Sequence, residues 1–344
     1  MREARYKLNA LRGGAFFKEL HFSSDNAPNI KFSATAEIKR SFSGEIVPDA
    51  DFDLLRDELQ PMIFSDGAWN SLGIFRPTTP KLSGSATGER LRIDAYDRSW
   101  LLQTSRIETR LHLAAGLNYI TAVEKQLTAS GIGLVIKTPT SSTLSCDRED
   151  WEPGTSRLTI VNTLLQEIGY RDIWFDGDGM AHLEPYAAPT AARISRRYSS
   201  RDVLRAPIAP DYQSESDIFS APNVFIVVCA NADNAETLVA TAVNDSPISS
   251  KSTFRRGMRI CQQVKVNQIA DQAALQAYAD RLVSESQLST QTITFSTLPE
   301  PGHGSGDVIA IDHPTIGGVY EETAWSLTMR SGELMSHSAK RTVL

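Results

Sequence analysis

Histidine, serine and aspartate, the residue types of a nucleophilic triad, occur together in one short segment, Gly302-His303-Gly304-Ser305-Gly306-Asp307. A nucleophile elbow places its serine between a strand and a helix, whereas this serine lies in a glycine-rich turn between two predicted strands. The members of a triad also converge from separate segments of a chain. We therefore predict a β-turn here, without a catalytic role.

Two acidic segments have residue types that suit a metal ion or a sugar. Asp176-Gly177-Asp178-Gly179 begins like a calcium loop, but Met180 and Ala187 stand where an EF-hand needs an oxygen ligand and its closing glutamate. Glu149-Asp150 with Glu152 could supply the two carboxyl groups of a glycosidase, which must lie roughly 5–10 Å apart across the sugar. We predict a tight hairpin turn for the first segment and a solvated loop for the second.

The other candidate residues lack the spacing that their chemistry requires. Neither a phosphate-binding glycine loop nor a paired zinc-ligand spacing occurs, and the arginine-rich stretch 193–205 favours a linker on an acidic surface or a subunit contact over a phosphate site. The six histidines show no i, i+4 pairing with one another, the spacing of a metalloprotease site: His21, His112, His182, His303, His313 and His337. We predict no catalytic, cofactor-binding or metal-binding residues.

Composition indicates a folded protein of two or three domains. The chain has 344 residues, of which 41% are hydrophobic and 22% charged, as in globular proteins. Its 35 basic and 41 acidic residues give a formal charge of -6, which argues against a general nucleic-acid binder. The sequence has no apolar run of membrane-spanning length, and residues 1–5 lack a signal-peptide core, so we expect a soluble protein that is not exported.

The three cysteines, Cys146, Cys229 and Cys261, are scattered along the chain. An odd number without paired spacings predicts reduced thiols rather than a disulfide framework. We expect all three to be packing residues.

Local patterns predict the elements that position these residues. Period-two alternation at 34–38 and 91–96 indicates strands with one solvated face, and Asp51 with Pro61 brackets a short helix at about 51–59. A second helix is predicted at 118–130 and a third from Ser156 to Gly169. The remaining predictions are a hairpin at 171–184, a buried strand at 224–230, a helix at 271–285, and strands at 292–295, 307–311 and 325–329.

A series of local patterns covers most of the chain: Ala36 to Gly44, Asp57 to Pro61, Ser71 to Phe75, Ala95 to Leu102, Trp151 to Ser156, Leu164 to Asp176, Arg281-Leu282, Gly306 to Ile309 and Trp325 to Met329. In order and spacing, these segments resemble the tail-hub (baseplate-hub) proteins of tailed bacteriophages and related contractile injection systems.

The resemblance implies a fold and a division of the chain. The fold class is α+β and β-dominated, with two small β-barrel or sandwich domains of the tube type flanking an inserted α/β domain. We expect a first tube-like barrel at 1–103, the α/β insertion at 104–186, an arginine-rich linker or excursion at 187–221, and a second tube-like barrel at 222–344. Our reading of two β-rich parts around an α/β part agrees with this order.

The resemblance also implies a structural role in the virion. Three subunits with two tube-like domains each would match a sixfold tail tube on one side and a threefold spike on the other. The implied partners are a homotrimer, the tail tube, spike, tape-measure and other baseplate proteins, with DNA only as passing cargo and no stable membrane insertion. Assembly is expected in the host cytoplasm, and the net charge suggests an acidic or neutral channel wall.

Two other functional classes stay open at this stage. One is a virion-associated enzyme acting on glycans or peptidoglycan, which requires a concave site with convergent carboxylates or a histidine. The other is a receptor- or glycan-binding tail module, which requires exposed aromatic side chains. We expect a non-enzymatic protein.

Overall fold

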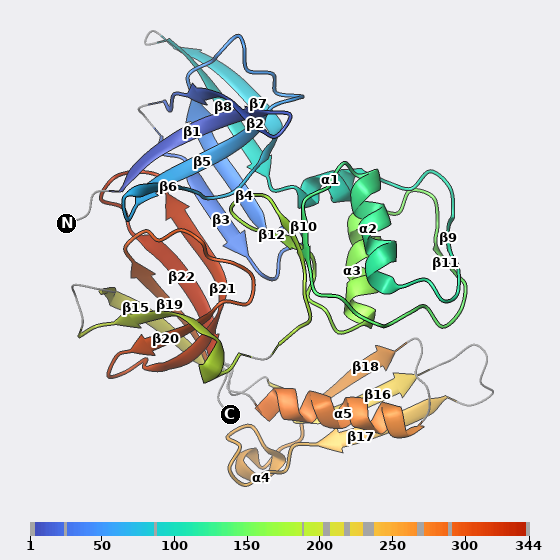
Figure 1. Cartoon of the computed structure of the whole chain (residues 1–344). Coiled ribbons are helices and arrows are strands. Elements are labelled where there is room, and N and C mark those ends of the chain that lie inside the picture. Colours follow the sequence, from blue (N-terminus) through green and yellow to red (C-terminus); the bar gives the residue numbers. More distant parts are fainter. Residues whose placement is uncertain are drawn as a thin grey trace.

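The computed structural model describes residues 4–23, 26–85, 88–187, 189–201, 207–216, 221–229, 237–266, 272–287 and 291–341. Strands dominate these residues and helices are few, which confirms the predicted β-dominated α+β class (Figure 1). No helix among the described residues combines the length and the apolar character needed to cross a membrane.

One ten-stranded sheet runs through both ends of the chain. Its main path is β15-β19-β22-β21-β3-β4-β8-β7, and β20 pairs with both β21 and β14 beside that path. The strands are β3 (Asn29–Ser33), β4 (Arg40–Ile46), β7 (Arg76–Ser85), β8 (Gly88–Tyr96), β14 (Ile194–Ser199), β15 (Ile208–Ser216), β19 (Gln291–Thr297), β20 (Val308–Asp312), β21 (Gly318–Thr328) and β22 (Met335–Arg341).

The antiparallel pairing of β3 with β21 joins the two halves of this sheet. Trp325 lies opposite Phe32 and Leu327 opposite Ile30, and the rings of Phe32 and Trp325 stack with centroids 5.9 Å apart. These side chains enter one buried cluster with residues of the first hundred, among them Leu8 and Phe42. The last strands of the chain therefore complete the hydrophobic core of its first part.

A four-stranded sheet closes the other side of that core. Its order is β2-β1-β5-β6, built from β1 (Arg5–Arg12), β2 (Ala15–Leu20), β5 (Glu58–Ser65) and β6 (Ala68–Ser71). Leu8, Ala10, Leu59 and Ile63 point from it into the core. A second, smaller core lies beneath the other half of the long sheet, around Tyr320, Ile293 and Ile309.

The predicted α/β insertion follows β8. It contains α1 (Ser99–Thr104), β9 (Leu111–Leu113), α2 (Tyr119–Ala129), β10 (Val135–Lys137), β11 (Arg148–Trp151), α3 (Arg157–Glu167), β12 (Trp174–Phe175) and β13 (Ala181–Leu183). The Asn118 and Ser156 side chains cap α2 and α3 by accepting bonds from backbone N–H groups of the first turn. Both predicted helices and the hairpin of β12 and β13 are confirmed.

A second insertion separates β15 from β19 (Figure 1). It contains β16 (Val224–Cys229), β17 (Leu238–Val243), α4 (Thr253–Arg256), β18 (Cys261–Val266) and α5 (Gln272–Gln287). Helix α5 covers one face of the sheet β17-β16-β18, burying Phe225 and Val227 against Leu275 and Ala279. The stretch 222–344 thus contains this module as well as four strands of the long sheet, β19 to β22.

Three local predictions are wrong for physical reasons visible in the side chains. In place of the expected helix at 51–59, residues 51–57 form turns and β5 begins at Glu58, because Asp57 accepts a bond from the Asp53 N–H and two from Arg12, which hold the backbone in another conformation. Residues 34–38 form the turn between β3 and β4. Cys229 is buried as expected, but Cys146 and Cys261 are exposed.

The stretch 187–221 also differs from the expected linker. It contains β14 and β15, which pair with β20 and β19 at the end of the ten-stranded sheet. Ser195 of β14 and Val308 of β20, which share a hydrogen bond, are 113 residues apart, so no local sequence pattern predicts the pairing of these strands. The residue limits expected for the four segments otherwise stay a prediction.

Replacing Leu327 tests whether the end of the chain holds the first core together. Leu327 is fully buried, so Leu327→Ala should lower the free energy of unfolding by about 2–5 kcal/mol. Leu82 on β7 is 60% exposed, so Leu82→Ala should change it by less than about 0.5 kcal/mol. Denaturant unfolding gives both values. Hydrogen exchange should quicken in β4 and β8 of the Leu327 variant, and unchanged protection there would contradict the shared core.

Candidate functional site

The outward face of the ten-stranded sheet is almost entirely polar. Partners in an antiparallel ladder lie on the same face, and the ladder places Ser326 beside Ser336 and Lys31, and Lys31 beside Ser41. We call this face, from β15 to β8, the polar belt. Its residues are Gln213, Glu215, Thr292, Thr294, Ser296, Ser336, Ser338, Lys340, Glu321, Ala324, Ser326, Thr328, Asn29, Lys31, Ser33, Ser41, Ser43, Glu45, Arg90, Arg92, Asp94 and Tyr96.

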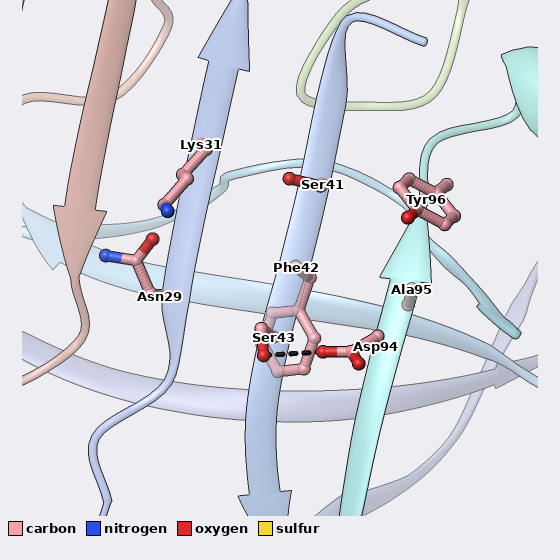
Figure 2. Close-up of a pocket in the computed structure, with 8 residues that line it drawn as sticks. All are labelled: Asn29, Lys31, Ser41, Phe42, Ser43, Asp94, Ala95 and Tyr96. Carbon is pink, nitrogen blue, oxygen red and sulfur yellow. Dashed lines mark hydrogen bonds between the residues drawn. The ribbon is translucent and has the colours of Figure 1, made fainter. Parts of the chain in front are cut away.

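Charges are balanced along the polar belt. Its cations are Lys31, Arg90, Arg92 and Lys340, and its anions are Glu45, Asp94, Glu215 and Glu321. Figure 2 shows the end of the belt on β3, β4 and β8, where Ser43 donates a 2.6 Å hydrogen bond to Asp94 beside a shallow cavity of about 150 Å³. Hydroxyl and amide groups therefore dominate a wide, nearly neutral surface.

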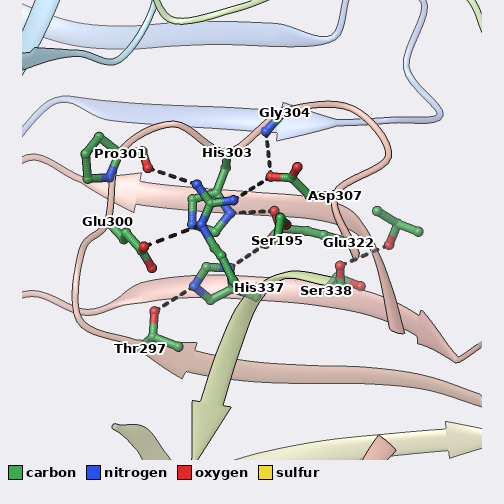
Figure 3. A network of polar contacts seen from close by, with 12 residues as sticks. Ser195, Thr297, Glu300, Pro301, His303, Gly304, Asp307, Glu322, His337 and Ser338 are labelled. Atoms are coloured by element: carbon green, nitrogen blue, oxygen red, sulfur yellow. Dashed lines mark hydrogen bonds and ion pairs between the residues drawn. The ribbon is translucent and has the colours of Figure 1, made fainter. Parts of the chain in front are cut away.

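The inner face carries a buried cluster of His303, Glu322 and His337, each at most 2% exposed. Glu322 belongs to β21, His337 to β22, and His303 to the loop before β20 (Figure 3). The Nδ1 atoms of His303 and His337 lie 2.6 Å from Glu322 Oε2 and Oε1, respectively. One carboxylate thus contacts two imidazole rings.

A β-bulge directs Glu322 into this cluster. The register of β21 on β22 shifts between Glu322 and Ala324, so that Tyr320 and Glu322 point inward before it and Trp325 and Leu327 after it. Without the extra residue, Glu322 would share the polar outward face with Ser326.

Burial and hydrogen bonding set the charge of the cluster. Burial raises the pKa of Glu322, but hydrogen bonds from His303 and His337 outweigh it and lower that pKa to about 2, so the carboxylate is ionised. Burial lowers the pKa of His337, which favours the neutral ring.

Two hydroxyl groups contact the outer ring nitrogens. Thr297 Oγ1 lies 2.8 Å from His337 Nε2, and the Tyr198 hydroxyl oxygen lies 3.5 Å from His303 Nε2. Thr297 also donates to the Leu298 carbonyl, and Tyr198 to Glu300. Each imidazole ring of the cluster thus contacts the Glu322 carboxylate on one side and a hydroxyl group on the other.

Arg40 connects this cluster to the first half of the chain. Its guanidinium donates to the carbonyls of Leu72 and His303 and lies over the rings of Phe32 and Trp325. Burial lowers the pKa of Arg40, although several carboxylates around it act in the opposite direction. A buried cation bonded to two loop carbonyls holds those loops in place.

A cavity of about 520 Å³ opens beside Arg40, where three parts of the chain meet. It is lined from β6, from the β12–β13 hairpin turn and from the loop at 301–304. The parts are in close contact around it: a Cβ on Gly304 would lie 2.8 Å from the Trp174 ring, and one on Gly177 would lie 2.6 Å from the Ser71 carbonyl oxygen.

The segment 302–307 forms a turn, as predicted. His303 contacts Glu322 instead of the nearby serine and aspartate, and Asp307 accepts bonds from Arg196 and the Gly304 N–H. The structure therefore does not bring His303, Ser305 and Asp307 together as a triad.

The acidic candidates also have structural partners. Asp176 accepts bonds from the N–H groups of Asp178 and Met180 within the predicted hairpin turn, and its other oxygen lies 2.8 Å from His182 Nε2. Glu149 and Glu152 are exposed and pair with Arg110. In the arginine-rich stretch, Arg196 pairs with Asp307, and Arg205 lies outside the described residues.

Glu322 and His337 were not found from the sequence. They are 15 residues apart, with no motif spacing, and only the strand register with its bulge brings them together. The alternation of inward residues in 335–339 is the one local signal, and it places His337 in the core without identifying its partner.

The fold is that of bacteriophage tail proteins. The structure matches the tail protein from Neisseria meningitidis MC58 with a TM-score of 0.69 and 16% identity, over 98% of this chain and 97% of the other. It matches the 43 kDa tail protein of prophage MuSo2 from Shewanella oneidensis with a TM-score of 0.69 and 12% identity, over 98% of both chains.

A third similar structure is the E. coli c3393 protein, described as a type VI secretion component with structural similarity to the T4 tail proteins gp27 and gp5. The TM-score is 0.52 at 12% identity, over 94% of this chain and 74% of the other. No protein-family model and no curated protein matches the sequence. The likeness inferred from sequence segments is thus confirmed as a likeness of fold.

A methyl group at Gly304 tests the close contact where β6, the β12–β13 hairpin and the loop at 301–304 meet. Trp174 is held between Gly304 and the His182 ring, whose centroid lies 4.1 Å from its own, so Gly304→Ala should destabilise the protein by about 1–3 kcal/mol. Gly133 has no heavy atom within 4 Å of such a Cβ, and Gly133→Ala should be nearly neutral. Thermal unfolding compares the two, and equal effects would contradict a rigid junction.

Proposed function

We propose that three copies of this chain form the hub of a phage-tail or injection-system baseplate, joining a sixfold tail tube to a threefold spike and lining the central channel. The observation that carries this proposal is the polar belt on one continuous sheet that spans two β-rich halves. The fold shared with phage tail proteins supports it.

The proposed match between threefold and sixfold symmetry follows from the two β-rich halves of the long sheet. Each half has its own hydrophobic core, and the β3–β21 pairing fixes one against the other. Three copies in a ring would offer six β-rich units, alike enough to meet a sixfold tube while the whole subunit keeps threefold symmetry. One chain can in this way adapt one symmetry to the other.

The polar belt suits the wall of a channel through which DNA passes. A basic wall would bind the phosphates and hold the DNA, because Lys and Arg contacts dominate non-specific affinity. The belt has as many anions as cations and is otherwise rich in hydroxyl groups, so it offers DNA little net attraction. With the belt on the channel, the wall would have the acidic or neutral character expected from the net charge.

The two edges of the long sheet fit a closed assembly. Pro77 and Pro80 lie in the edge strand β7, and Pro210 lies in the edge strand β15. Proline cannot donate to a ladder, so it limits unintended strand pairing at an edge. We infer that neighbouring subunits meet mainly through side chains there.

The partners in this role are the tail tube, spike, tape-measure and other baseplate proteins, and the location is the virion after assembly in the host cytoplasm. The two insertions extend from the β-rich halves and are free to contact baseplate proteins. A glycan-acting enzyme or a receptor-binding module is the alternative, but Glu149 and Glu152 lie exposed beside Arg110, and no observation favours a sugar site there.

Oligomeric state and location test the hub role. We expect trimers in mass photometry, alone or after addition of the tube or spike protein, and a threefold ring between tube and spike in images of intact tails. Epitope-tagged chain should copurify with tails. A free monomer that hydrolyses glycans and never associates with virions would overturn the proposal.

Added charge on the belt tests the channel wall. Ser326→Lys with Ser336→Lys puts two neighbouring cations on the belt, the first of them beside Lys31, and should leave tail assembly intact but slow DNA release, with relief at higher salt. The control adds two lysines at exposed positions of α2, Thr128→Lys with Ala129→Lys. Release kinetics from purified virions give the comparison, and equal rates for both variants would place the belt outside the channel.

A further inference from the structure

The buried cluster of His303, Glu322 and His337 has the donor set of a transition-metal site. Two imidazole nitrogens and one carboxylate oxygen lie within 4.8 Å of one another, on three different segments. Two nitrogen ligands with a carboxylate suit Zn²⁺ and its neighbours, whereas Ca²⁺ and Mg²⁺ prefer oxygen ligands.

The hydroxyl groups around the cluster indicate where the ring protons lie. A hydroxyl has one hydrogen to donate. When Thr297 donates to the Leu298 carbonyl at 2.9 Å, its oxygen can accept from His337 Nε2–H at 2.8 Å. When Tyr198 donates to Glu300 at 3.1 Å, its oxygen lies 3.5 Å from His303 Nε2 and can accept in the same way.

A neutral imidazole with its proton on Nε2 presents a lone pair at Nδ1. In that tautomer both Nδ1 lone pairs face the Glu322 carboxylate oxygens at 2.6 Å, and a divalent cation between them would be held by all three groups. In the other neutral tautomer each Nδ1–H donates to the carboxylate, and the cluster is closed by hydrogen bonds without an ion. Metal binding distinguishes the two arrangements.

We propose that His303, Glu322 and His337 bind one divalent transition-metal ion of the Zn²⁺ class through both Nδ1 atoms and the Glu322 carboxylate. The outer N–H groups then donate to Thr297 and Tyr198, as metal-bound histidines donate to groups around a site. Bond lengths of about 2.0–2.2 Å require the donor atoms to move slightly apart from their present separations.

The ion would tie the loop before β20 to β21 and β22. Because that loop also receives the Arg40 hydrogen bond, the metal would stabilise the contact between the two halves of the chain. A metal ion that binds the folded protein and not the unfolded chain stabilises the folded state. This inference does not depend on the hub role.

A titration of the full chain tests the site. After treatment with a chelator, wild-type protein should bind one equivalent of Zn²⁺ in calorimetry, and its Tm should rise by several degrees. Co²⁺ should give a visible absorption spectrum of a nitrogen- and oxygen-ligated ion. Failure of the wild type to bind one equivalent overturns the proposal and leaves a hydrogen-bonded, protonated cluster.

Variants separate this site from adventitious binding. Glu322→Gln and His303→Gln should abolish the Zn²⁺-dependent rise in Tm, and Thr297→Val should weaken affinity about 10–100-fold by removing the acceptor of the His337 N–H. The control His112→Gln removes an exposed histidine and should bind as the wild type does. Equal binding by all variants, or loss only in the control, also contradicts the proposal. Should the first two variants not fold, the wild-type titration and Thr297→Val decide.

Discussion

The pairing of β3 with β21 is the contact on which the rest of the structure depends. It fuses two β-rich halves into one sheet, supplies Trp325 and Leu327 to the core of the first half, and aligns outward hydroxyl groups of both halves on one face. A slip of one residue would turn Trp325 and Leu327 outward and move Ser326 and Thr328 into the core. Core and polar belt are thus two results of one register.

Buried polar groups make that strand register more specific. Arg40 needs the carbonyls of Leu72 and His303, and Glu322 reaches His303 and His337 only because of the bulge before Ala324. Other arrangements would leave charged groups buried without partners, at a cost of several kcal/mol. These groups contribute less to net stability than to the choice of one arrangement among several.

Sequence reasoning succeeded where structure is local. Ser156 begins a helix, and Asp176 with Gly177 makes a hairpin turn, because the signals and their effects lie within a few residues. It failed where distant residues decide: Arg12 helps hold 51–57 in a turn, β14 pairs with β20, and Glu322 meets His337 across a bulge. The general fold could be anticipated, whereas the buried cluster could not.

The distance along the chain between β3 and β21 has a consequence for biosynthesis. Asn29 and Thr328, which bond across this pairing, are 299 residues apart. At translation rates of about 5–20 residues per second, β3 leaves the ribosome roughly 15–60 s before its partner strand is made. During that interval Ile30 and Phe32 lie on an open edge of a nascent sheet, a hazard for aggregation. The first half of the chain therefore reaches its final form only near the end of synthesis, and slow translation or chaperones would affect its yield more than its stability.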